Sequence, residues 1–151
     1  MVCRHCWTLT LVENKSCKKI YQTTSDKKLR EFGHKAFHRI LVTNKELKLF
    51  KIKNDDMCFQ CKDLDSLEHT FLECPMNVQL YQGILLWFNT VNNTRINLLV
   101  DQMFLQNYPP PAIRDVLWHW LNLLILLTKS YIYIVVKLMR KILILYNVQI
   151  R

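Results

Sequence analysis

Hydrophobic residues recur at helical spacing in several parts of the chain, and this pattern predicts a mainly α-helical protein. A first helix is expected to start at Ser25 or Asp26, whose side chains suit an N-cap, and to run to about residue 41. Its apolar positions are Leu29, Phe32, Ala36 and Ile40. Another helix is expected over residues 77–91, where the polar run 92–94 ends it. Its apolar positions include Val78, Tyr81, Leu85, Phe88 and Val91.

Two shorter helices are expected between these. Thr43 and Glu46 form a capping box, which predicts a short helix that buries Leu47 and Phe50. Further on, Asp63, Asp65 and Ser66 offer N-cap oxygens before a short helix over residues 67–72. An apolar patch at 98–105 and three prolines at 109–111 predict a stiff bend before the last element.

The last element, about residues 112–146, is the most apolar part of the chain. Its uncharged stretch, 116–128, is shorter than the roughly 20 residues needed to cross a bilayer. Beyond it, one helical arc of about 120° carries basic residues and Tyr133; they are Lys129, Lys137, Arg140 and Lys141. The opposite arc holds Ile132, Val135, Val136 and Met139. We expect a core helix that becomes amphipathic, with a membrane-associated helix or a partner-binding helix as alternatives.

Composition and charge refine this picture. Half of the 151 residues are hydrophobic, which suits one folded domain; residues 1–24 form a poorly defined lead-in and 25–151 the helical domain. Residues 1–54 carry 13 Lys or Arg against 4 Asp or Glu, residues 55–115 carry 3 against 8, and residues 116–151 carry 5 against none. Basic ends favour a polyanionic partner such as RNA or DNA, although basic surfaces also occur without one.

The strongest chemical signal is Cys58-x2-Cys61-x7-His69-x4-Cys74. Three thiolates and one imidazole are typical of a tetrahedral Zn²⁺ site, here a CCHC knuckle over residues 58–74. His69 and Cys74 would lie about 140° apart on an unbroken α-helix, so Cys74 must leave the helix to reach the metal. Pro75 favours that exit because the residue before a proline avoids the α region. Buried cysteines without a metal are the alternative.

Other candidate sites are weaker. Cys3, Cys6 and Cys17 form a second group, for which His34 or His38 would have to supply a fourth ligand. No secretory signal is recognisable at the start, so reduced cysteines and an intracellular location, in cytoplasm or nucleus, are expected.

A catalytic site is not expected. The adjacent Asp55 and Asp56 follow Lys53 and Asn54 and have no matching third acid, so they indicate a polar loop and not a magnesium site. The two glycines of the chain, Gly33 and Gly83, do not form a phosphate-cradling loop. Polymerase and endonuclease motifs are absent, and the chain is not expected to be an enzyme.

The sequence resembles the zinc-binding region that follows the reverse transcriptase of LINE-type, non-LTR retrotransposons. The resemblance covers roughly residues 20–135 and is most specific in Leu67-Glu68-His69-Thr70-Phe71-Leu72-Glu73-Cys74-Pro75, with Cys58 and Cys61 before it; it also includes residues 29–41, Thr43-Asn44-Lys45, Leu47, Trp87 and the helix 118–133. It implies that Cys58, Cys61, His69 and Cys74 bind zinc. It further implies a fragment of a polyprotein that assists binding of element RNA or target DNA, next to an upstream polymerase domain. A non-functional remnant is an alternative.

The acidic knuckle shifts the expected nucleic-acid contacts to the basic helices. Asp63, Asp65 and Glu68 lie between Cys61 and His69 with only Lys62 to balance them. Phosphate contacts are therefore expected from Lys28, Lys35, Arg39, Lys45 and Lys48, or from Lys137, Arg140 and Lys141. Phe59 either stacks on an unpaired base or packs the knuckle. A zinc-stabilised scaffold that docks on the polymerase through the apolar last helix is the rival function.

Overall fold

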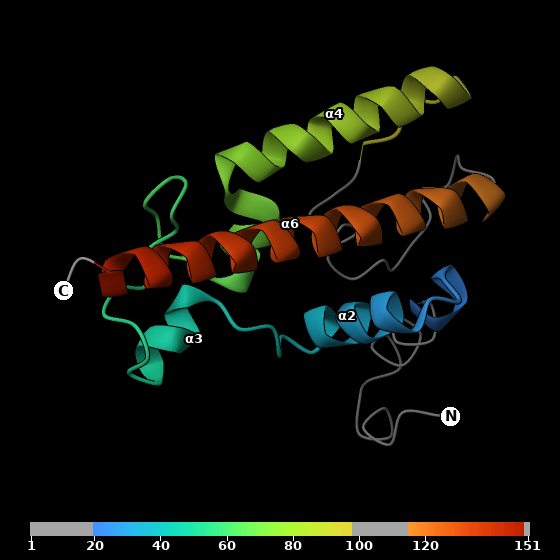
Figure 1. The fold of residues 1–151 in the computed structure, drawn as a ribbon. Helices are drawn as coiled ribbons and strands as arrows, with labels where there is room; N and C mark the ends of the chain where they lie inside the picture. Colours follow the sequence, from blue (N-terminus) through green and yellow to red (C-terminus); the bar gives the residue numbers. More distant parts are fainter. Residues whose placement is uncertain (1–19, 98–114, 150–151) are drawn as a thin grey trace.

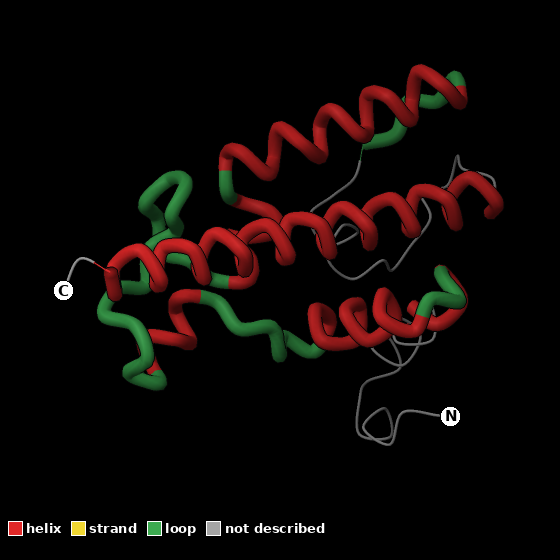
Figure 2. Tube along the Cα trace, in the orientation of Figure 1, coloured by secondary structure: helices red, strands yellow, loops and turns green. Residues whose placement is uncertain are grey.

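The computed structural model describes residues 20–97 and 115–149, with side chains through Met139 in the last helix. Its elements are α2 (Lys27–Phe37), α3 (Asn44–Leu49), the π-helical turn η2 (His69–Glu73), α4 (Pro75–Asn92) and α6 (Asp115–Gln149). The long α6 lies between α4 and α2, and η2 packs against both α4 and α6 (Figure 1). Loops join the helices, and the described residues contain an isolated bridge between Met57 and Leu64 but no strand (Figure 2). The expected mainly helical fold is confirmed.

Helix α2 begins where the sequence predicts. The Asp26 carboxylate caps it by accepting a hydrogen bond of 2.7 Å from the Leu29 amide. The helix ends at Phe37, so the expected end at about residue 41 is wrong; the reason is that Arg39 adopts a left-handed backbone conformation with φ of 55°. Ile40 therefore lies outside the helix and is 59% exposed, so its expected place on the apolar face is wrong. Leu41 is buried in its stead.

Helix α3 carries the expected capping box between Thr43 and Glu46. The Thr43 amide donates a hydrogen bond of 2.8 Å to the Glu46 carboxylate. Leu47 is half-buried, but Phe50 is 64% exposed, so its expected burial is wrong. Phe50 is the C-cap of a helix of only six residues, and Lys51 then takes a positive φ of 58°, which turns the chain away from the core.

Helix α4 confirms the helix expected over residues 77–91. Pro75 occupies its first turn, where the missing N–H costs nothing, and Asn93 ends it in the left-handed conformation. Tyr81 and Phe88 face the core, whereas Val91 is exposed. The apolar patch 98–105 and the prolines 109–111 lie outside the described residues.

Helix α6 contributes to two hydrophobic clusters. Ile132 and Val136 pack with Phe71 and Tyr81 in one, and Leu121 packs with further apolar side chains in the other. The members of the second cluster are Phe88, Ile96, Trp118, Leu121 and Ile125. The long core helix expected at the end of the chain is thus present.

One basic residue of α6 departs from expectation. Lys129 is 4% exposed, because it shares the core-facing side of the helix with Ile125 and Val136. Its expected place on a solvent-exposed basic face is wrong. Burial lowers the pKa of Lys129 to about 7, since a low-polarity environment disfavours the charged form. Met139, expected on the buried arc, is 38% exposed.

By length and composition alone, the stretch Asp115–Met139 of α6 is apolar enough to cross a membrane. Core helices of soluble proteins meet the same criterion, and 44% of its apolar window is buried against the rest of the chain. The packing of α2, α4 and η2 around α6 accounts for that burial.

Candidate metal centre

Cys58 and Cys61 lie in a tight loop before η2. The Cys58 amide donates a hydrogen bond of 2.7 Å to the Asp63 carbonyl, and the Lys62 amide donates one of 3.0 Å to the Cys58 carbonyl. Lys62 has a positive φ of 69°, which lets the chain reverse. The bridge between Met57 and Leu64 closes the base of the loop. The loop thereby directs two sulfur atoms to one side, as a C-x2-C turn must do to share an ion.

His69 and Cys74 lie at the two ends of the π-helical turn η2. The Ser66 hydroxyl accepts a hydrogen bond of 3.0 Å from the His69 amide, so Ser66 is the cap among the three candidates considered. The Cys74 amide donates to the His69 carbonyl at 2.8 Å, a bond that spans five residues. Cys74 itself is extended, with φ of −61° and ψ of 121°, as expected before Pro75. A π turn brings residues five apart onto one face, which an α-helix does not.

Four ligand atoms converge at this point. The Sγ atoms of Cys58, Cys61 and Cys74 and a ring nitrogen of His69 all lie within 4.8 Å of one another. Ligands of a tetrahedral Zn²⁺ ion are separated by roughly 3.8 Å, so the cluster is of the size that one ion requires. Cys58, His69 and Cys74 are buried, and Cys61 is partly exposed. The three thiols are free and not paired in disulfides.

Two of the thiols, those of Cys61 and Cys74, lie in an environment that disfavours their charged forms unless a cation is near. Desolvation raises the pKa of Cys61 to about 12, and burial also raises the pKa of Cys74, with a further contribution from Cys58. The Cys61 sulfur lies 3.1 Å from His69 Nε2, and the Cys74 thiol donates to Gln60 Oε1 at 3.1 Å. A bound Zn²⁺ supplies the positive charge that makes such thiols thiolates.

Buried polar contacts hold the metal loop to the neighbouring helices. Asp65, 2% exposed, accepts a hydrogen bond of 3.0 Å from the Asn44 amide and one of 2.8 Å from the Thr70 hydroxyl. The Asn77 side chain of α4 donates to the Thr70 carbonyl at 2.7 Å. The sequence suggests Asp65 as a helix cap and as part of the acidic knuckle, not as a buried acceptor. Its role as a tertiary acceptor depends on α3, 21 residues earlier, and no local signal in the sequence indicates it.

A family model described as "zinc-binding in reverse transcriptase" matches residues 2–81, just over half of the chain. The helical fold and the cluster of three cysteines and one histidine are those of a zinc-binding domain. The family match shows that this chain belongs to the zinc-binding family of reverse transcriptases. Zn²⁺ is the cofactor of this domain. Members of the family are accessory domains and not catalytic ones. Neither the curated proteins nor the solved structures contain a match. The family match begins at residue 2 and so extends into the expected lead-in.

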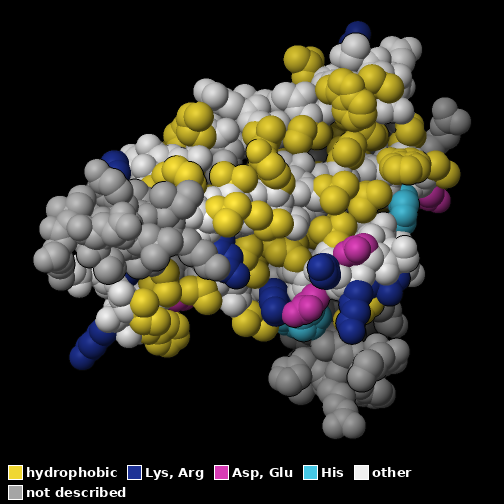
Figure 3. Space-filling view, viewed as in Figure 1, with side chains coloured by type: hydrophobic (Ala, Val, Ile, Leu, Met, Phe, Trp, Pro, Cys, Tyr) yellow, Lys and Arg dark blue, Asp and Glu magenta, His cyan; other side chains and the backbone are white. Residues whose placement is uncertain are grey.

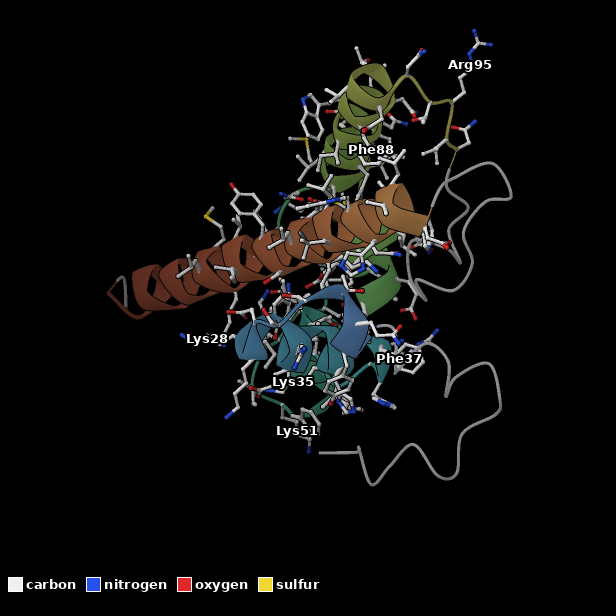
Figure 4. The ribbon with its side chains drawn as sticks, turned by 90° about the vertical axis from the view of Figure 1, so that its right-hand side faces the viewer. Lys28, Lys35, Phe37, Lys51, Phe88 and Arg95 are labelled. Atoms are coloured by element: carbon white, nitrogen blue, oxygen red, sulfur yellow. The ribbon has the colours of Figure 1, made fainter. Side chains whose placement is uncertain are left out.

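The structure also locates most of the residues expected to contact nucleic acid. Lys28, Lys35 and Lys137 line one groove of about 410 Å³ between α2 and the C-terminal half of α6. Figure 4 shows Lys28 and Lys35 on α2, which lies beneath α6 in that view. Lys45 is exposed on α3. Arg140 and Lys141 belong to α6, but their side chains lie outside the described part.

Three of the expected contact residues already have acidic neighbours. Lys35 pairs with Glu31 at 2.7 Å, Arg39 with Glu68 at 3.0 Å, and Lys48 with Asp56 at 3.0 Å. All three pairs are at least partly exposed to solvent, which screens them, so each lysine or arginine can exchange its acidic partner for a phosphate. Lys53 pairs with Asp55 at 3.0 Å, so both aspartates of the Asp55-Asp56 loop are in ion pairs with lysines.

Phe59 is half-buried and packs against the cluster that contains Phe71 and Tyr81. This position favours the structural role, packing of the knuckle, over stacking on a base. Cys3, Cys6 and Cys17 lie outside the described residues. His34 and His38, their expected partners, lie on α2 and its C-cap with ring centroids 4.3 Å apart.

Proposed function

We propose that this chain is a non-catalytic accessory module of a LINE-type reverse transcriptase, in which Zn²⁺ fixes the fold and basic helices bind RNA or DNA. Cys58, Cys61, His69 and Cys74 are the proposed ligands. The metal joins the loop at 58–61 to the turn η2, and η2 packs on α4 and α6. Zinc binding therefore stabilises the framework that carries the basic residues.

The ligand assignment is tested by the metal content of the purified chain. Structural zinc contributes roughly 10–16 kcal/mol of apparent binding free energy, comparable with the stability of a whole domain. Elemental analysis of the purified chain should find the one zinc ion that the described cluster would hold. The Cys74→Ser variant should lose this zinc, and η2 should unfold in it. Cleanly folded protein without zinc would contradict the assignment.

The convergence of Lys28, Lys35 and Lys137 on one groove is the observation that carries the nucleic-acid proposal. Two of these lysines lie on α2 and the third is about a hundred residues later, yet the fold places them around a common space. On the face shown in Figure 3, Lys and Arg side chains gather over α2 with a few acidic side chains among them, whereas hydrophobic side chains lie over the coloured parts of α4 and α6. A local concentration of positive charge attracts the phosphates of a nucleic acid.

The electrostatic mechanism makes affinity depend on salt. If three phosphates are neutralised, binding of a single strand should weaken roughly 20-fold when salt rises from about 50 to about 200 mM. Fluorescence anisotropy with a labelled RNA and the zinc-loaded chain measures this. Absence of binding at low salt, or binding that ignores salt, would refute the function.

An exposed apolar stripe on α6 favours a second candidate, docking on the upstream polymerase domain. Six large apolar side chains lie within about 60° of one another on this helix, opposite its buried side; they are Val116, Trp120, Leu127, Tyr131, Ile134 and Leu138. Such a continuous apolar stripe at helical spacing is typical of a helix that packs against another protein surface.

The two candidates differ in their response to salt. Docking through the stripe should survive high salt in a pull-down with the upstream polymerase fragment, and Trp120→Ser with Ile134→Ser should abolish it. Nucleic-acid binding should be unaffected by that pair of changes. A monomer with no affinity for the polymerase fragment would count against docking.

A further inference from the structure

The groove between α2 and α6 has a composition that goes beyond a positive patch. Its α2 wall consists of Lys28, Glu31, Phe32 and Lys35, which share one helical face, and its α6 wall consists of Tyr133 and Lys137. The segment after α2 closes it with Ile40, Leu41 and Val42. Charged side chains therefore alternate with aromatic and aliphatic ones around a single space.

An aromatic pair forms part of the lining. The ring centroids of Phe32 and Tyr133 lie 5.9 Å apart with an interplanar angle of 43°, and Phe32 also packs edge-on against Phe71 at 6.3 Å. Phe71 is fully buried, so it anchors Phe32 from the core side. Tyr133 is half-buried and keeps part of its surface at the groove. The rings are thus held in place by the same core that the metal turn joins.

The groove has a size and charge that suit one nucleotide and not a duplex. A volume of about 410 Å³ lies within the range of small-molecule sites. Three lysines and one glutamate leave an excess of positive charge at the groove. Ile40 and Val42 are 59% and 40% exposed, and so add apolar surface at its edge. A paired base presents no free face to such a site, whereas an unpaired base can stack on an aromatic ring.

We propose that this groove binds single-stranded nucleic acid by holding an unpaired base against Tyr133, with flanking phosphates on Lys28, Lys35 and Lys137. This inference rests on the proposed nucleic-acid function and narrows its ligand to single strands. Glu31, which pairs with Lys35 at 2.7 Å, releases that lysine when a phosphate arrives. Sequence preference is weak, because every base has a stacking face.

The test compares a labelled single-stranded RNA of about ten nucleotides with a duplex of the same length, using the zinc-loaded full chain. The single strand should bind at least about tenfold more tightly, and Tyr133→Leu should lower its affinity about tenfold while Tyr133→Phe keeps it. Replacing Lys28, Lys35 and Lys137 together by Gln should lower the salt slope by about 2. Lys51→Gln, an exposed lysine outside the groove, is the matched control and should change little.

The possible outcomes distinguish a failure of the groove assignment from a failure of the proposed nucleic-acid-binding function. If neither RNA binds at low salt, the proposed function itself fails. If both bind equally, or if folded Tyr133→Leu binds as the parent does, nucleic-acid binding stands and the groove assignment is overturned. Zinc content and circular dichroism of each variant show whether the fold is retained. Should the leucine variant unfold, the comparison of single strand with duplex and the triple replacement of Lys28, Lys35 and Lys137 still decide the groove assignment.

Discussion

The Cys74 amide donates a hydrogen bond of 2.8 Å to the His69 carbonyl, so two candidate zinc ligands are the first residue and the C-cap of the same turn, η2. This bond makes η2 a π-helical turn. π turns are rare and are frequently found at functional sites. The sequence spacing His69-x4-Cys74 therefore specifies the backbone geometry of the site.

Deleting Leu72 tests this relationship. The deletion shortens the spacing to x3, so the bond from the Cys74 amide to the His69 carbonyl can no longer span five residues, and Cys74 and the start of α4 shift by one residue relative to the other three ligands. We expect zinc affinity, measured by competition with a chelator, to fall about 100-fold or more. Leu72→Ala keeps the spacing and should retain zinc binding with a modest loss of stability. Equal losses in the two variants would show that packing of Leu72, and not spacing, matters.

Local chemistry in the sequence predicts the candidate site and several helix starts well. Asp26, the Thr43–Glu46 box and Pro75 act on backbone groups within a few residues, so their effects are visible without the fold. The convergence of the four candidate ligands is predictable for a similar reason, because metal spacing is a short-range constraint.

Features that depend on backbone turns or on distant contacts are not predicted by the apolar spacing. Ile40 and Phe50 fall outside the core because Arg39 and Lys51 take left-handed conformations, which apolar spacing does not reveal. Lys129 is buried because the surrounding helices cover its side of α6, and a helical wheel cannot show which side that is. Lys28 and Lys137 line the same groove, and this can be known only once α2 and α6 are placed relative to each other.

Asp65 is expected to contribute strongly to stability. Replacing it by Ala leaves the buried Asn44 amide and the Thr70 hydroxyl without their acceptor, which should cost about 2–4 kcal/mol of unfolding free energy. Urea denaturation of the zinc-loaded protein measures this. Glu73→Ala, an exposed acid in η2, should change stability by less than about 0.5 kcal/mol. A loss at Asp65 no larger than that at Glu73 would contradict the tertiary role.

Replacing each of the two glycines by alanine should change the stability of the protein in opposite directions. A Cβ added at Gly33 would meet Ile20 at 2.9 Å and Leu126 at 3.1 Å, because α2 approaches α6 closely there. Gly83, in the middle of α4, has nothing within 4 Å of such an atom. We expect Gly33→Ala to destabilise by about 1 kcal/mol and Gly83→Ala to stabilise by about 0.5–1 kcal/mol, the gain in helix propensity. Thermal unfolding of the pair decides, and a gain at both positions would show that α2 and α6 are less tightly packed.

Lys129 should make stability depend on pH in a defined window. Its pKa is lowered from 10.5 to about 7 in the fold, so between these values the unfolded chain binds more protons than the folded one. Stability must therefore rise with pH from about 7 to 10.5, and the burial cost is fully present below pH 7. Lys129→Met removes the titrating group, fills similar volume and should stabilise the protein by about 1–3 kcal/mol at pH 6.

The difference between parent and Lys129→Met isolates this residue from the zinc thiolates, which titrate equally in both proteins. Unfolding free energies measured at several pH values should show a gap that is widest below pH 7 and closes as pH approaches 10.5. A gap that does not change with pH would mean that Lys129 keeps its charge in the fold. In that case its stabilising partners, and not its neutralisation, make burial at the centre of α6 tolerable.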